Sequence, residues 1–212
     1  MYTLYGSRGS GSAAIEAALE MTGANFRIVD AASWDPASAI DELARINPLA
    51  QIPTLLLPDS SVLTESAAIL LHLGLAHPSA RLLPVDPAAR AQSIRGLVFI
   101  AANCYAAVGI SDYPERWYKA AEKPAKTTTE RIRAGARARL YRYWEMFADQ
   151  FSARPFLDGE TPGALDLLAS VVSRWSGARA HIKTARPEFF ATIERIEGEP
   201  LIARVYARHW TA

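Results

Sequence analysis

Along the first part of the chain, short runs of apolar residues alternate with segments in which apolar residues recur every three to four positions. Short apolar runs bounded by turn-forming residues are typical of strands, and the second spacing is typical of helices with one buried face. The resulting order, β-α-β-α-β-β-α, builds a mixed four-stranded sheet with helices packed on it. The predicted strands are Tyr2–Tyr5, Phe26–Val29, Thr54–Leu57 and Val62–Thr64, and the predicted helices are Ala13–Met21, Ala37–Ile46 and the stretch from Glu65 to about His77.

The pattern changes after a proline-rich connector that runs from His77 to Pro87. Beyond it, long segments with helical spacing follow one another and no convincing strand is present. We therefore predict two domains, an α/β domain over residues 1–78 and an all-α domain over residues 87–212. The helices predicted in the second domain run from Asp86 to about Gly109, over Lys126–Phe151, from Pro162 to about Trp175, and over Pro187–Ile196 and Pro200–Arg208.

The most informative stretch, residues 47–73, joins the last two predicted strands to the third helix. Glu65 and Ser66 fall in the first turn of that helix, where backbone N–H groups without partners suit a carboxylate or phosphate. Pro53 stands at the start of a strand, although proline has no N–H to give to a sheet. If the Ile52–Pro53 bond is cis, the backbone of Ile52 faces outward and can pair with an extended peptide; the alternative is an ordinary trans proline.

Two motifs stand together in this stretch. Gln51-Ile52-Pro53-Thr54-Leu55 matches the cis-proline motif of the cytosolic glutathione S-transferase family, and Glu65-Ser66-Ala67-Ala68-Ile69 matches that family's Glu-Ser-x-Ala-Ile motif. The chain resembles this family over its whole length, more loosely in the second half. The resemblance implies an α/β thioredoxin-like N-terminal domain that binds glutathione as co-substrate, followed by an all-α C-terminal domain. It also implies that Gln51, Ile52, Pro53, Glu65 and Ser66 bind glutathione.

The loop Gly6–Ser12 joins the first strand to the first helix, and its glycines let the backbone approach a ligand closely. Capping of the helix is the alternative role for its serines. In the family, this loop carries the residue that stabilises the glutathione thiolate. Ser10 lies where serine-type members have their hydroxyl, and Gly11 stands where cysteine-type bacterial members have their cysteine, which argues against a mixed-disulfide mechanism. Ser10 is therefore our first choice as catalytic residue, Ser12 the second and Tyr5 a distant third.

Aromatic residues gather near the end of the first long helix of the second domain and in the segment after it. The resemblance implies that this region walls the pocket for a small hydrophobic electrophile, although packing in the core or a place on the surface is an equal alternative for each of them. The residues are Tyr105, Tyr113, Trp117 and Tyr118. Asn103 is a further candidate for contact with glutathione across a dimer.

Asp166 falls at the predicted start of another helix, three residues after Gly163. The family usually has serine or threonine at the position of Gly163, forming a buried capping box with the aspartate. We expect one side-chain cap to be lost here, and we expect Asp166 to accept backbone N–H groups and to serve folding rather than chemistry.

Composition narrows the function classes. Cys104 is the only cysteine, which excludes a disulfide framework and favours a reducing, cytoplasmic location; its apolar neighbours indicate a small core residue. Residues 1–80 hold 3 basic and 8 acidic residues and residues 81–212 hold 20 and 14, but no interleaving of aromatic and basic residues points to nucleic acid. We expect no membrane span, export signal or metal site, because no apolar run approaches ~20 residues and the histidines lack ligand spacing.

The expected function is therefore that of a glutathione transferase, in which the glutathione thiolate attacks a small hydrophobic electrophile or reduces a hydroperoxide. A homodimer is expected from the resemblance, with the helices after Glu65 and Pro87 at its interface. The alternative is a module of the same fold that acts in binding or regulation without catalysis.

Overall fold

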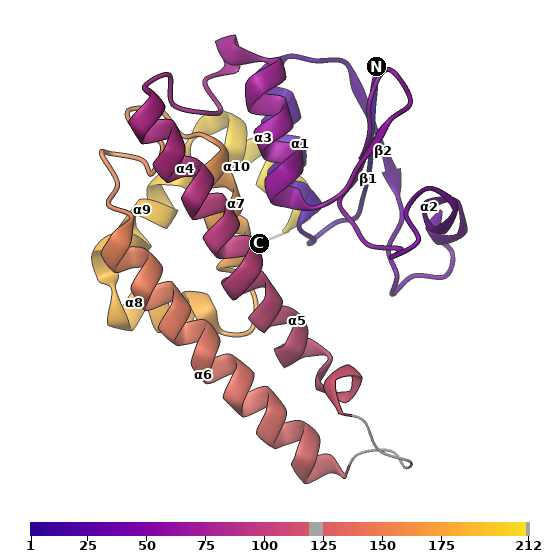
Figure 1. Cartoon of the computed structure of the whole chain (residues 1–212), viewed down its shortest axis with the longest axis vertical. Helices are drawn as coiled ribbons and strands as arrows, with labels where there is room; N and C mark the ends of the chain where they lie inside the picture. Colours follow the sequence, from indigo (N-terminus) through magenta and orange to yellow (C-terminus); the bar gives the residue numbers. More distant parts are fainter. Residues whose placement is uncertain (119–124, 211–212) are drawn as a thin grey trace.

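The described part of the chain, residues 1–118 and 125–210, contains a mixed sheet of four strands in the order β2-β1-β3-β4 (Figure 1). In this computed structural model, β1 (Tyr2–Gly6) runs parallel to β2 (Phe26–Asp30) and antiparallel to β3 (Thr54–Leu56), and β3 pairs antiparallel with β4 (Val62–Leu63). The parallel pair requires a crossover connection, which the first helix supplies. The predicted order of strands and helices along the chain is confirmed, and each strand ends within one residue of its prediction.

Helices cover both faces of this sheet. Successive residues of β1 point to opposite faces. Leu4 lies in the large core beneath α1 (Ser12–Thr22) and α3 (Ser66–Ala76), whereas Tyr5 packs in a smaller cluster on the side of α2 (Ile40–Ile46). The N-terminal part is thus a thioredoxin-like α/β unit, as the sequence predicts.

The rest of the described chain is helical. A long helix begins with α4 (Pro87–Phe99), passes through the π-helical segment η2 (Ile100–Tyr105) and ends with α5 (Ala106–Asp112). Figure 1 shows α6 running alongside α5. The other elements are η1 (Pro78–Ala80), η3 (Pro114–Trp117), α6 (Lys126–Gln150), α7 (Ala164–Val172), α8 (Ala178–Ala185), α9 (Pro187–Gly198) and α10 (Pro200–His209).

The helix α8 has no counterpart among the predicted elements, and α7 is shorter than the predicted helix from Pro162 to Trp175. Both differences have one cause, because the chain ends α7 and turns through Gly177 in the left-handed conformation. A side chain added at Gly177 would also meet the hydroxyl of Tyr141 at 2.7 Å. Sequence periodicity alone did not reveal this break.

The helix α1 lies at the centre of the molecule, between the sheet and the helical part (Figure 1). It packs against α3, α7 and α10, and its residues from Ser12 to Leu19 are all buried. Four of them are alanines, whose small side chains allow helices to approach closely. The hydrophobic core consequently runs without interruption from the sheet into the helical part.

The helix Pro87–Asp112 is long and apolar enough to cross a membrane by length and composition, which departs from our sequence-based expectation. In the fold it packs on α3, α6 and α7, and 39% of its apolar window is buried. Cys104 within it is completely buried, and burial raises the pKa of its thiol. The interpretation of Cys104 as a core residue is confirmed.

The start of α7 keeps its caps in spite of Gly163. The carboxylate of Asp166 accepts hydrogen bonds from the backbone N–H groups of Leu157, Asp158 and Gly163 at 2.8, 3.1 and 3.0 Å. The expectation that a side-chain cap is lost needs correction, because Asp158 supplies one from outside the helix: its Oδ2 accepts the N–H of Leu165 at 2.8 Å.

Candidate active site

A cavity of about 560 Å³ opens between the loops of the sheet and the long helix of the second part. This volume lies in the range of small-ligand sites. The sheet side of its lining is formed by Gly9, Ser10, Gly11, Ser33, Trp34, Asn47, Ala50, Gln51, Ile52, Pro53, Thr64, Glu65 and Ser66, and the helical side by Ala101, Tyr105, Ala106, Val108, Gly109, Asp112, Tyr113, Arg116, Trp117 and Trp175. The cavity brings together all six residues that the sequence marks for catalysis or glutathione binding.

The loop before β3 presents Gln51 and Ile52 to this cavity. The Ile52–Pro53 bond is cis, which decides between the cis and trans alternatives that the sequence left open. The buried side chain of Asn47 fixes the loop by donating hydrogen bonds to the Gln51 carbonyl at 3.1 Å and to the Thr54 hydroxyl at 2.9 Å. Asn47 therefore holds the loop from the protein interior, while Gln51 and Ile52 remain open to the cavity.

The N-terminus of α3 forms a second side of the cavity. Ser66 begins the helix and is 7% exposed, and its hydroxyl finds no hydrogen-bond partner among the described residues. Glu65 precedes it with φ +64°, a conformation rarely adopted by residues other than glycine and concentrated at functional sites. An unpartnered buried hydroxyl next to free helix N–H groups is a site for an anion.

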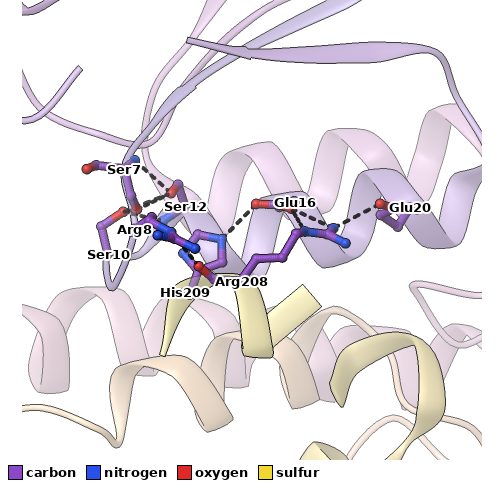
Figure 2. A network of polar contacts seen from close by, with 8 residues as sticks. All are labelled: Ser7, Arg8, Ser10, Ser12, Glu16, Glu20, Arg208 and His209. Atoms are coloured by element: carbon purple, nitrogen blue, oxygen red, sulfur yellow. Dashed lines mark hydrogen bonds and ion pairs between the residues drawn. The ribbon is translucent and has the colours of Figure 1, made fainter. Parts of the chain in front are cut away.

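The loop between β1 and α1 closes the cavity at a third side, and Figure 2 shows its serines. The hydroxyl of Ser10 donates to the Ser7 carbonyl at 2.7 Å and lies 2.8 Å from the hydroxyl of Ser12. The Ser12 hydroxyl also reaches the Ser7 carbonyl, at 3.1 Å. Ser10 lines the cavity, whereas Ser12 is not part of its lining.

The C-terminal helix holds this loop in place (Figure 2). Arg8 donates to the carbonyl of Arg208 at 2.8 Å, and the buried carboxylate of Glu16 pairs with Arg208 and, at 2.7 Å, with Nε2 of His209. Burial raises the pKa of the Glu16 carboxyl, but hydrogen bonds and positive charge from His209 and Arg208 outweigh it and leave the pKa below its usual value. The loop between β1 and α1, and α1 behind it, are thus held by residues about 190 positions further along the chain.

The helical wall of the cavity is aromatic. Tyr105 stacks on Trp175 with ring centroids 5.6 Å apart, and Arg116 lies 4.0 Å above the ring of Tyr113. Trp117 is exposed at the rim. Three of the four aromatic residues predicted to wall the pocket lie in its lining: Tyr105, Tyr113 and Trp117.

Two residues predicted near this wall lie elsewhere. Tyr118 is 41% exposed and is not part of the lining, so of the alternatives that the sequence left open for it the structure favours a place on the surface. Asn103 donates to the Phe99 carbonyl within its own helix at 3.1 Å, and it also lies outside the lining.

Other lining residues escaped the sequence analysis. Trp34 follows β2 and is 59% exposed, and Trp175 follows α7. Both stand in loops, where no periodicity marks a residue as facing a ligand. A large aromatic residue in a loop was the available signal for each of them.

Comparisons with known proteins agree with this geometry. The family model described as the glutathione S-transferase N-terminal domain matches residues 1–74. The chain is 33% identical over 176 residues, 82% of each chain, to an uncharacterised GST-like protein, YncG, of Escherichia coli K12. The chain therefore belongs to the glutathione S-transferase family.

Solved structures of related proteins share the fold. A glutathione transferase homologue from Sulfitobacter, solved with bound glutathione, is 25% identical with a TM-score of 0.82, over 97% of this chain and 96% of that one. A glutathione S-transferase from Methylobacterium radiotolerans, solved in complex with glutathione sulfonate, is 25% identical with a TM-score of 0.74, over 100% of this chain and 97% of that one.

Proposed function

We propose that this protein is a glutathione transferase that joins glutathione to small hydrophobic electrophiles. The observation that carries the proposal is the unpartnered, buried hydroxyl of Ser66 at the N-terminus of α3, inside the cavity. The γ-glutamyl carboxylate of glutathione supplies what this site lacks, an anionic hydrogen-bond acceptor. The related structures solved with glutathione or its sulfonate support the same ligand.

In the proposed complex, Glu65 lies near the ligand ammonium and the backbone of Ile52 pairs with the cysteinyl part of glutathione like an added strand. Gln51 and Pro53 flank this contact. The cysteinyl sulfur then points toward the turn at Gly9–Gly11. Ser10, the loop hydroxyl in the lining, is the candidate donor from this turn, and it would have to give up its bond to the Ser7 carbonyl to reach the sulfur.

The site needs to lower the pKa of the glutathione thiol only slightly. A free thiol has a pKa near ~8.5 and is mostly protonated at neutral pH, and one hydrogen bond to the anion together with a helix N-terminus lowers that pKa by about one to two units. The thiol proton leaves to water, the thiolate forms a carbon–sulfur bond, and the leaving group of the electrophile takes the electron pair. In the alternative reaction, two glutathione molecules are oxidised to the disulfide while a hydroperoxide is reduced to alcohol and water.

The aromatic wall favours a planar, apolar electrophile. Trp34, Trp117 and Trp175 line the same cavity as the proposed sulfur position. Flat rings prefer to stack at offset contact, so aromatic substrates gain most from such a wall.

We also propose a homodimer in the cytoplasm. The helices α3 and α4 contact each other and expose apolar side chains, Leu75 at 65%, Val98 at 52% and Ile94 at 37%. Apolar side chains exposed on two neighbouring helices support this proposal, since interfaces between protein chains bury such residues. Sedimentation equilibrium at micromolar concentration should give twice the mass of the chain, and a monomer would contradict the proposal.

Titration calorimetry with glutathione tests the binding site. Ser66→Ala should weaken binding roughly ten- to a hundredfold, because a hydrogen bond to a charged group contributes about 1.5–3 kcal/mol. Ser111→Ala is the matched control, since the Ser111 hydroxyl is also buried and unpartnered among the described residues but lies outside the cavity lining. Equal affinities for Ser66→Ala and the unmodified protein would place the ligand elsewhere.

A second experiment separates catalysis from binding alone. The protein should be retained on immobilised glutathione and should conjugate glutathione to an aromatic halide in solution. Retention without turnover across a panel of aromatic halides, epoxides and hydroperoxides would favour the non-catalytic module.

A further inference from the structure

The hydroxyl of Tyr105 occupies the space that a side chain at Gly11 would need. A Cβ built on Gly11 would lie 2.5 Å from that hydroxyl oxygen, and 3.6 Å from Cδ of Pro53. Three segments therefore meet at one point: the loop before α1, the cis-proline loop and the end of η2. This point adjoins Ile52, beside which the cysteinyl part of glutathione is proposed to bind.

We propose that Tyr105, a residue of the helical part, donates the hydrogen bond that stabilises the glutathione thiolate; the inference rests on the proposed function. Gly11 leaves room for the tyrosine hydroxyl at the place from which a side chain of the loop would otherwise reach the sulfur. The loop then contributes its shape, and the donor comes from the opposite wall of the cavity.

The hydrogen bonds of the loop support this assignment. Each serine hydroxyl has a single proton to donate. Those of Ser10 and Ser12 are directed to the Ser7 carbonyl or to each other. Among the described residues, none of the hydrogen bonds in the structure involves the Tyr105 hydroxyl, and Tyr105 lines the cavity. The proton of the Tyr105 hydroxyl is therefore free for a ligand, whereas those of Ser10 and Ser12 are already engaged.

Tyr105 is also held in position before any ligand arrives. Its ring lies parallel to that of Trp175, with 5° between the planes. It stands at the end of the π-helical segment η2, and a π turn accommodates an extra residue and so changes which side chains after it face inward; such turns are frequent at functional sites. A donor that is already oriented loses little entropy when the sulfur binds.

The protonation state of Tyr105 suits a donor. Burial, and after it the negative charge of Glu65, raises the pKa of the Tyr105 hydroxyl to about 12. The hydroxyl therefore keeps its proton at neutral pH and donates a hydrogen bond to the anion, while the thiol proton itself goes to water.

Tyr105→Phe is the direct test, because it removes the hydroxyl and keeps the ring on Trp175. We expect turnover at neutral pH to fall about ten- to a hundredfold, corresponding to about 1.5–3 kcal/mol for one donor to a charged group. The pKa of bound glutathione, followed through the ultraviolet absorbance of the thiolate, should rise toward ~8.5, the value of a free thiol. The dissociation constant for glutathione should change by less than about threefold, because the contacts of Ile52, Glu65 and Ser66 remain.

Tyr118→Phe is the control for loss of a tyrosine hydroxyl outside the cavity, and it should leave the thiolate titration unchanged. Ser10→Ala distinguishes the two donors. A raised thiol pKa in Ser10→Ala together with an unchanged one in Tyr105→Phe would overturn the inference and assign the role to Ser10. Unchanged titrations in both variants would overturn it as well. Failure of the unmodified protein to bind glutathione would instead remove the proposed function.

Gly11→Ala gives an independent test. The backbone of Gly11 is right-handed helical, which alanine adopts readily, so the only obstacle is the contact with Tyr105. In the unmodified background the new methyl group should displace the hydroxyl and raise the thiol pKa. In the Tyr105→Phe background the same change should have little further effect. Equal effects in both backgrounds would contradict the shared role of these two positions.

Discussion

The carboxylate of Asp158 fills the space above Gly163 that a side chain at that position would need. A Cβ on Gly163 would collide with Oδ2 of Asp158 and would lie 2.8 Å from the carbonyl oxygen of Leu82. The same Oδ2 accepts the N–H of Leu165 in the first turn of α7. The side chain of Asp158 therefore occupies the place of the capping side chain that Gly163 lacks, and it accepts a hydrogen bond in its stead.

Gly163→Ser should therefore destabilise the protein, although serine is the residue common in the family at this position. Forcing extra atoms into a packed site costs typically 1–3 kcal/mol. The free energy of unfolding from urea titration measures the effect. Gly135→Ser is the control, because a Cβ at Gly135, also within a helix, meets no atom within 4 Å. A gain in stability for Gly163→Ser would contradict this, because it would mean that the Asp158 side chain moves aside without destabilising the protein.

The pair Asp158 and Asp166 should make stability depend on pH. Burial raises the pKa of both carboxyls, and the charge of Asp158 raises that of Asp166 further. Both oxygens of Asp166 accept N–H groups, whereas Oδ1 of Asp158 has no partner among the described residues, and the two buried carboxyls titrate as one coupled pair. A raised carboxyl pKa contributes stability that is complete below the unfolded value of ~3.9 and is lost as pH rises through the folded values.

Asp158→Asn keeps the shape, removes one of the two carboxyls, and removes the charge that raises the pKa of Asp166. Its stability relative to the unmodified protein should improve as the pH rises from about 4 to about 7. Unfolding in urea at several pH values measures this slope. Asp149→Asn is the control, because the hydrogen bond from Arg186 keeps the pKa of Asp149 below its usual value and so outside this window. Parallel pH profiles for Asp158→Asn and the unmodified protein would contradict a protonated pair.

Glu16 should contribute stability with the opposite dependence on pH. Because its folded pKa is lowered, the contribution is present above the unfolded value of ~4.3 and is lost as pH falls through the folded value. Glu16→Gln should cost about 1–3 kcal/mol at neutral pH, since it weakens the pairs with Arg208 and His209.

Glu20→Gln is the matched control for Glu16→Gln. Glu20 lies one turn along α1, pairs with Arg208 at the more exposed end of the network, and should cost less than 1 kcal/mol as surface pairs do. Urea unfolding near pH 7 and near pH 3 measures both. A loss for Glu16→Gln that stays the same in acid would mean that packing, not the ion pairs, holds the C-terminal helix on the loop.

The sequence by itself determined the features that depend on neighbouring residues. The order of strands and helices along the chain followed from apolar runs and turn residues, since a strand or helix buries one face and that face repeats with a short period. Pro53 left a cis and a trans bond open, and the family motif around it favoured cis. Glu65-Ser66 marked the helix start, because this is a local backbone effect whose cause lies within a few residues. This is why the fold class and the residues gathered around the cavity could be predicted together.

Only the tertiary structure decided the contacts between residues far apart in the chain. Tyr105 meets Gly11 and Glu16 meets His209 because α1 lies between the sheet and the helical part, and no local pattern encodes that packing. The same holds for Asp158, which could take the place of a cap at Gly163 only once the loop before α7 had folded back. A side chain fills a gap left by another through volume and distance in space, and those are fixed when the helices pack.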